Sequence, residues 1–157
     1  MSKSDPADRK PHRQSCPEES TFLELSRTAD LLSRPIASLL KSQELSLTQY
    51  NVLRILRGTP EGLPCGEIAN RMITRDPDIT RLLDRLEKRT LIARFRDSKD
   101  RRLVMASISP EGLKLLSTLD APVRQRHQDQ LGHLKKKHLN ALIELLQLAR
   151  KPAPDHG

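Results

Sequence analysis

Apolar residues recur at both ends of this chain with the three- and four-residue spacing that places them on one face of an α-helix. The spacing predicts a first helix over residues 21–43, with a kink at Pro35, because proline has no backbone N–H and its ring crowds the preceding turn. Two further helices are predicted over residues 110–150, the first running toward Pro122 and the last marked by leucines from Leu131 onward. A small central domain cannot bury both apolar stripes alone.

The middle of the chain shows the same helical spacing in shorter stretches. Ser46 followed by Gln49 is the pattern of a capping box, and the helix that it starts ends where glycine and proline follow. Asp76, with a proline directly after it, is a typical acidic start for a later helix. Three short helices are therefore predicted, over about residues 46–57, 65–72 and 76–89.

Residues 92–108 alternate between apolar and polar side chains on either side of a charged turn. This period of two predicts a two-stranded β-hairpin with an exposed tip. Two short helices joined by a tight turn and followed by a hairpin are the parts of a winged helix-turn-helix, whose second helix enters the major groove of DNA. The predicted fold is mainly α with a small β-hairpin wing, in which a DNA-binding lobe over about residues 46–109 lies between N- and C-terminal helices.

Composition narrows the choice of partner. The net charge of +8 favours a polyanion, whereas aromatic residues make up only 2% of the chain, so there are few rings on which single-stranded bases could stack. Double-stranded DNA is therefore expected. No stretch of apolar residues is long enough to cross a membrane or to serve as a signal peptide, which predicts a cytoplasmic protein without a membrane partner. Residues 1–20 and 151–157, polar and rich in proline, are expected to be disordered tails.

The positive charge is concentrated in one fifth of the chain. Residues 71–102 hold eleven basic and six acidic residues, and so carry five of the eight excess positive charges. Because the apolar positions of this stretch already account for its buried face, its basic residues are expected to face outward. The predicted second helix of the helix-turn-helix and the hairpin thus form a candidate surface for DNA.

The segment ITRLLDRLEKRTLIARFRDSKDRRLVMASISPEGLKLL resembles the signature of the MarR family of transcriptional regulators. The motifs DRLEKR, RDSKDRR and SPEG occur in the family's order, and a weaker likeness extends over residues 21–148. The resemblance implies a homodimer, joined by helices within residues 21–43 and 110–150, that reads an inverted repeat in double-stranded DNA. It also implies a repressor that a small phenolic or other aromatic effector releases.

The resemblance also assigns DNA-binding roles along the recognition helix. Thr80 and Arg81 match positions that contact base edges or adjacent phosphates, and Arg85 matches a backbone contact. An acidic helix start opposes phosphate but stabilises the helix N-terminus, and it is a departure from the family's pattern. The residues that match the groove-facing start of this helix are Arg75, Asp76 and Asp78.

In the wing, the resemblance implies that an arginine reaches the minor groove while acidic residues hold the turn. Arg101 is the candidate for the groove, with Lys99 as a phosphate contact beside it. A second departure from the family precedes the wing, where Thr90 stands at a position that is often glycine with a positive φ. The residues that match the family's acidic and arginine pattern are Asp97, Asp100, Arg101 and Arg102.

Other candidate chemistry is weak. The two cysteines, 49 residues apart, form no metal or disulfide spacing, and the spacing of the histidines does not place two of them on adjacent helical turns. Neither a nucleophile with its base nor a glycine-rich phosphate loop is visible, so no enzyme activity, metal or cofactor is expected. The alternative is a winged helix that contacts protein or RNA, which the fold by itself does not exclude.

Overall fold

The computed structural model describes residues 16–152, which fall into two compact units divided between Arg34 and Pro35. The first unit consists of the N-terminal part of α1 (Pro17–Lys41), whose residues up to Arg34 are mostly exposed. Residues 17–20 are therefore helical, although the sequence placed them in a tail. The helix is continuous through Pro35, and the kink expected there stays a prediction. The tail residues 1–15 and 153–157 lie outside the described part.

In the second unit, α2 (Leu47–Arg57) begins with the capping box that the sequence predicted. The hydroxyl of Ser46 accepts from the N–H of Gln49 at 3.1 Å, and the Gln49 side chain accepts from the N–H of Ser46 at 3.0 Å. Two N–H groups that would lack helical partners are thereby satisfied. The helix ends at Gly58, as its glycine-proline signal indicated.

The helix-turn-helix consists of α3 (Cys65–Arg71) and α4 (Ile79–Lys88), joined by an irregular turn. The prediction that α4 starts at Asp76 is wrong. The cap is Asp78, whose carboxylate accepts from the N–H of Arg81 at 3.0 Å, while Asp76 accepts from the N–H of Asp78 at 2.8 Å. Both aspartates suit a helix start by type, and the local backbone geometry decided which of them became the cap.

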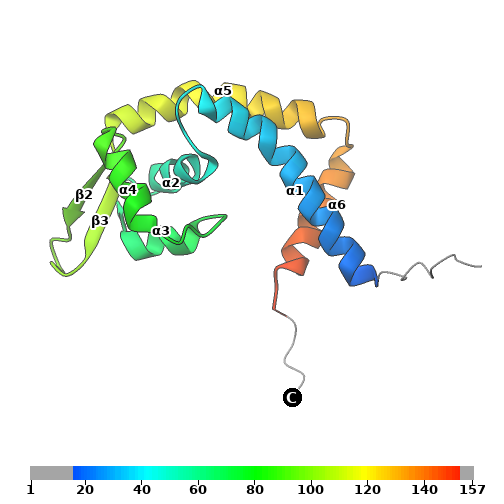
Figure 1. The fold of residues 1–157 in the computed structure, drawn as a ribbon, viewed down its shortest axis with the longest axis horizontal. Coiled ribbons are helices and arrows are strands. Elements are labelled where there is room, and N and C mark those ends of the chain that lie inside the picture. The colour runs from blue at the N-terminus through cyan, green and yellow to red at the C-terminus, as the bar shows by residue number, and fades with distance from the viewer. Residues whose placement is uncertain (1–15, 153–157) are drawn as a thin grey trace, which may run out of the picture. The chain divides into compact units, whose positions relative to one another are not determined.

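The predicted hairpin is present as β2 (Ile92–Arg96) and β3 (Val104–Ile108), shown beside α4 in Figure 1. A third strand, β1 (Leu63–Pro64), pairs antiparallel with β3, so the sheet has the order β1-β3-β2. The sequence did not predict β1, because two residues are too few to show an alternating pattern. β1 attaches the segment before α3 to the wing.

Thr90 ends α4 in the left-handed conformation that is usually given to glycine, with φ 58°. Its N–H donates to the carbonyl of Glu87 at 2.8 Å, and the N–H of Leu91 donates to the carbonyl of Leu86 at 3.0 Å. These two bonds form a Schellman motif. The helix end is therefore well defined despite the departure from glycine.

The last two helices are α5 (Pro110–Leu131) and α6 (Lys136–Ala149). The prediction that α5 stops near Pro122 is wrong: α5 continues for nine residues beyond it and includes Leu131, which the sequence placed in the final helix. Pro122 is exposed, so water can hydrate the carbonyl that loses its helical donor. Tertiary context has kept the helix intact.

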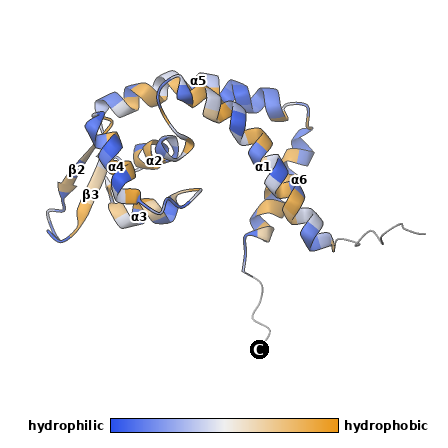
Figure 2. Cartoon of the chain, viewed as in Figure 1, coloured by the Kyte–Doolittle hydropathy of each residue, from blue (hydrophilic) through white to orange (hydrophobic). Residues whose placement is uncertain are grey.

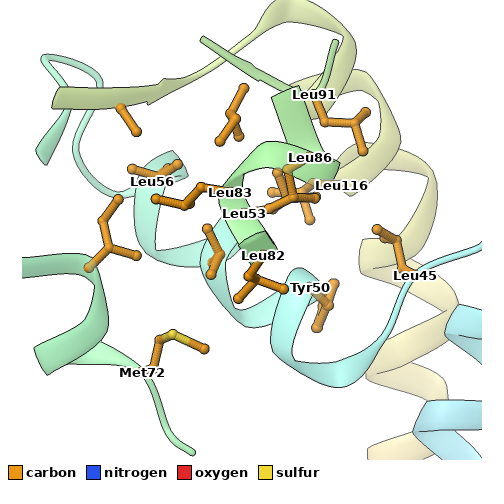
Figure 3. Packing of buried hydrophobic residues seen from close by; sticks show 14 of the residues in the cluster. Leu45, Tyr50, Leu53, Leu56, Met72, Leu82, Leu83, Leu86, Leu91 and Leu116 are labelled. Carbon is orange, nitrogen blue, oxygen red and sulfur yellow. The ribbon is translucent and has the colours of Figure 1, made fainter. Parts of the chain in front are cut away.

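One hydrophobic core holds the second unit together, as the close view in Figure 3 shows. Leu53 and Leu56 of α2 meet Leu83 and Leu86 of α4, and Leu116 joins them from α5; each is at most 1% exposed. The apolar spacing of these helices predicted which faces would be buried. The core therefore fixes the recognition helix against its support and leaves its opposite face exposed.

Candidate nucleic-acid interface

α4 has one buried face and one polar, exposed face. Leu82, Leu83 and Leu86 are buried, which turns Arg81 and Arg85 toward solvent. Ten residues of helix thus present cations on the side away from the core, as a helix that enters a groove must. The remaining exposed residues that the sequence assigned to this site are Arg75, Asp78 and Thr80, and Asp76 is half-buried.

Several cations of this region have no protein partner. Within the described residues, these side chains make no hydrogen bond or ion pair, so their charge is available to a ligand. Two of them, Lys99 and Arg101, are in the wing tip, and the others are in or before α4. Lys88 belongs to this set, although the family resemblance assigned it no role. The full set is Arg75, Arg81, Arg85, Lys88, Lys99 and Arg101.

Two further cations of residues 71–102 are engaged within the protein: the half-buried Arg89 departs from the outward-facing prediction, whereas Arg71 is exposed but paired. The half-buried Arg89 donates to the backbone carbonyls of Gln43 and Glu44 at 3.0 and 2.7 Å, which fastens the loop before α2 to the end of α4. Arg71 pairs with Glu67 within α3. Both arginines already have partners in the protein, so the charge available to DNA is smaller than the sequence count.

Arg94 departs furthest from the outward-facing prediction. From β2 it donates to the carboxylates of Asp84 and Glu87 on α4, while its own backbone N–H donates to Glu87 at 2.9 Å. These bonds hold the pKa of Glu87 below its usual value, chiefly through the side-chain hydrogen bond from Arg94. Arg94 therefore ties the wing to the recognition helix. Sequence spacing gave no sign of this contact, since the strand and helix residues meet only in three dimensions.

The wing tip is held by hydrogen bonds from its two aspartates. Asp97 accepts from the N–H of Asp100 at 3.0 Å, and Asp100 accepts from the backbone and the side chain of Arg102. The side-chain hydrogen bond from Arg102 is the main reason that the pKa of Asp100 lies below its usual value. Arg102 is thus partly engaged within the turn, whereas Arg101 beside it is exposed and unpaired.

The second unit also contains a hollow of about 490 Å³ between α2, α5 and the start of α6. Arg57 pairs with Asp120 across it at 2.9 Å, and Arg54 stacks over the Tyr50 ring, 5.8 Å from its centroid. Burial raises the pKa of Tyr50. The lining is a mixture of cationic and apolar groups: Tyr50, Arg54, Arg57, Asp120, Val123, Arg124, His127, Gln128, Leu131, Gly132 and Leu139.

The remaining chemistry-bearing residues form no further cluster. Burial raises the pKa of Cys65, which disfavours the reactive thiolate, and Cys16 is exposed at the start of α1. Over residues 16–152, no group of three histidine, cysteine or acidic side chains is placed to hold a metal ion. Within the same part of the chain, no helix has the length and apolar character needed to cross a membrane.

Comparison with known proteins shows which family has this sequence pattern and fold. The model of the MarR family matches residues 45–104, which span the lobe from α2 to the start of β3. The chain is 28% identical over 124 residues to the HTH-type transcriptional regulator PecS of Dickeya dadantii (strain 3937), covering 76% of this chain and 75% of that protein.

Solved structures agree. A MarR transcription factor from Planctomyces limnophilus is 44% identical, with a TM-score of 0.62 over 85% of this chain and 97% of that one. CouR from Rhodococcus jostii RHA1, bound to p-coumaroyl-CoA, is 27% identical, with a TM-score of 0.75 over 90% of this chain and 98% of that one. With its helix-turn-helix, its wing and these relatives, the chain belongs to the MarR family of transcriptional regulators.

Proposed function

We propose that this regulator binds a specific inverted repeat in double-stranded DNA as a homodimer and acts as a repressor that a small effector releases. The observation that carries the proposal is the set of cations without protein partners on α4 and the wing tip. Two elements that the core and Arg94 hold together can contact neighbouring grooves of one duplex. We propose that the regulator acts in the cytoplasm, and catalysis has no part in this proposal.

In the major groove, we assign base reading to Thr80 and Arg81, which are exposed near the start of α4. Arg85 and Arg75 supply phosphate contacts that fix the register of the helix on the duplex. Asp76 and Asp78 repel phosphate but can accept from the amino group of cytosine, so they would contribute to base choice rather than to affinity; their carboxylates are already engaged in local hydrogen bonds.

In the wing, Arg101 is the proposed minor-groove residue. A narrow A·T-rich minor groove concentrates negative potential and attracts an unpaired guanidinium. Lys99 and Arg102 lie on either side of it along the turn and would contact phosphates. Asp97 and Asp100 support the turn through their hydrogen bonds to its backbone N–H groups.

The apolar surface of the last helix supports the proposed homodimer. None of the residues of α6 is buried in the single chain, and Figure 2 shows apolar residues along this helix. Ile143, Leu145 and Leu148 are 52%, 63% and 62% exposed. A second copy that covers this face would place two winged lobes about a two-fold axis, which an inverted repeat in DNA matches.

The effector is proposed to bind in the hollow between α2 and α5. Arg54 and Arg124 line it without an acidic partner, and Arg57 is neutralised by Asp120, so the hollow favours a ligand with a negative charge and an apolar body. CouR was solved with p-coumaroyl-CoA, which joins an aromatic acyl group to the negatively charged coenzyme A, and this supports an aromatic effector here. Binding there would act on α2, which packs against the recognition helix.

The test is a selection of duplex fragments from a random pool with the purified full-length protein, followed by titration of the recovered sequence. Arg81→Ala is expected to weaken binding to the selected operator by about 1–3 kcal/mol and to relax the preference for particular bases. Arg101→Ala should reduce the preference for A·T-rich flanks, because the groove contact is lost.

Lys99→Ala is the matched control. Because Lys99 is proposed to contact phosphate, its loss should lower the affinity for all sequences alike. It should also reduce the slope of log K against log salt by about one unit. If Arg101→Ala bound operators with A·T-rich flanks as tightly as the parent protein does, the wing would not read DNA. If hairpin RNA competed as well as the selected duplex, the alternative function in protein or RNA contacts would replace this one.

A further inference from the structure

Ile73 is an anomaly in the turn between α3 and α4. Its side chain is 86% exposed, a larger fraction than for any other large hydrophobic residue of the described chain. The preceding Met72 is buried in the core, and the following Thr74 and Arg75 are exposed. A single exposed apolar residue is common on protein surfaces, so its position has to decide whether it has a role.

The backbone at Ile73 is fixed rather than free. Its N–H donates to the side-chain oxygen of Asn51 on α2 at 2.8 Å, and the adjacent Met72 side chain anchors the turn in the core. The hydrogen bond and the anchor hold the apolar side chain outward at one point of the molecular surface. A contact made from such a position costs little ordering on binding.

The chain runs from Ile73 directly into the N-terminus of α4, the part of a recognition helix that lies closest to base edges. The intervening residues include Arg75, which carries the proposed phosphate contact, and Asp76 and Asp78, whose charges disfavour a close approach to phosphate. An apolar side chain offers nothing to a phosphate, so a base edge is the partner that suits Ile73. In the major groove, the one apolar group that a base presents is the C5 methyl of thymine.

We infer that Ile73 reads a thymine by packing on its C5 methyl group, and so determines sequence specificity from the turn rather than from the recognition helix. This inference rests on the proposed function, since it needs a specific duplex. It adds an apolar contact to a site that otherwise consists of charged and polar groups. Asn51 acts as the positioning residue, because it holds the backbone from which the side chain projects.

The experiment replaces each thymine of the selected operator by deoxyuridine, which removes only the methyl group, and measures Kd for the full-length protein. At one thymine in each half-site, removal of the methyl group should raise the Kd of the parent protein about fourfold per half-site. This change corresponds to the burial of one methyl group. Ile73→Ala should bind the thymine operator more weakly than the parent protein by a similar factor. Its Kd should not rise further on the deoxyuridine operator.

Ile73→Val, which keeps a branched apolar side chain, should retain most of the sensitivity to the methyl group. Because the side chain is exposed, Ile73→Ala should melt at the same temperature as the parent protein, and its Kd for random duplex should be unchanged. These two measurements separate a lost contact from a damaged fold.

The inference is overturned if no thymine-to-deoxyuridine change affects the parent protein, or if Ile73→Ala remains fully sensitive to the methyl group. It is also overturned if Ile73→Ala binds the operator as tightly as the parent, because no contact would then have been lost. In each of these cases a specific operator still exists and the proposed function stands. If selection recovers no preferred duplex, both fall.

Discussion

The winged lobe and the last helix use their leucines in opposite ways. In the lobe, Leu53, Leu56 and Leu86 are completely buried, although the elements that bear them are short. In α6, Leu145 and Leu148 are more than 60% exposed, although the apolar spacing of this helix is equally regular. The lobe thus completes its own core within one chain, whereas the last helix does not.

The difference separates two kinds of information in one helical pattern. Apolar spacing shows that a face will be covered, but it does not show whether the cover belongs to the same chain. A face left open in the single chain is a surface for a partner. Mutations in the lobe are therefore expected to change the free energy of unfolding. Mutations on the apolar face of α6 are expected to change mainly the association of two copies.

The largest effect is expected from substitutions that place charges on the exposed apolar face of α6. The double variant Leu145→Arg with Leu148→Arg should be monomeric in sedimentation, because two guanidinium groups would have to be desolvated in the interface. Its affinity for the full inverted repeat should fall about 10²- to 10⁴-fold, since two linked half-sites become independent. Affinity for an isolated half-site should be kept.

Gln147→Arg is the control for that comparison, because Gln147 is exposed on the polar stripe of the same helix. It adds charge without touching the apolar face, so it should remain dimeric. A doubly charged α6 that still sedimented as a dimer would show that another surface joins the two copies.

The next effect acts on the closed core of the lobe. A Cβ at Gly112 would lie 2.3 Å from the carbonyl oxygen of Leu91 and 2.8 Å from the Ile108 side chain, so this glycine of the SPEG motif lets α5 approach the sheet. Gly112→Ala should lower the free energy of unfolding by about 1–3 kcal/mol in urea titrations. At Gly66 a Cβ meets nothing within 4 Å, and Gly66→Ala should be neutral or slightly stabilising.

A smaller effect is expected at the link between wing and recognition helix. Arg94→Ala removes the hydrogen bonds to Asp84 and Glu87 and should destabilise the lobe by about 1–2 kcal/mol at neutral pH. Arg96→Ala on the same strand is the exposed control, with a change within about 0.5 kcal/mol.

The same link predicts a pH dependence. Since Arg94 lowers the pKa of Glu87 in the folded state, its stabilisation is complete above the unfolded glutamate pKa of about 4.3 and is lost as the pH falls through the lower folded value. Urea unfolding of the parent protein should therefore weaken more steeply below about pH 4.3 than that of Arg94→Ala. Parallel pH profiles would contradict the assignment of this ion pair.

The smallest effect is expected at the end of α4. Thr90 holds a left-handed φ of 58°, which costs a residue with a Cβ more than it costs glycine. Thr90→Gly should raise the free energy of unfolding by about 0.5–1 kcal/mol, because relief of strain outweighs the greater freedom of glycine in the unfolded chain. Thermal melting checks the sign, and a lower melting temperature would mean that the threonine side chain stabilises this turn.

The sequence by itself determined the features that depend on near neighbours along the chain. The capping box of Ser46 and Gln49, the buried stripe of α4 and the pairing of β2 with β3 are local features, and the structure contains all three, although Ala93 and Phe95, the apolar positions of the β2 alternation, are exposed. Each forms because residues within a few positions of one another satisfy hydrogen bonds or share one face.

The tertiary structure alone decided the rest. It carried α5 through Pro122 and turned Arg94 inward to the acids of α4. The ion pair of Arg57 with Asp120 joins residues 63 positions apart. Such contacts depend on which surfaces the core brings together, and a basic residue has the same letter in the sequence whether it meets a carboxylate or stays free for DNA.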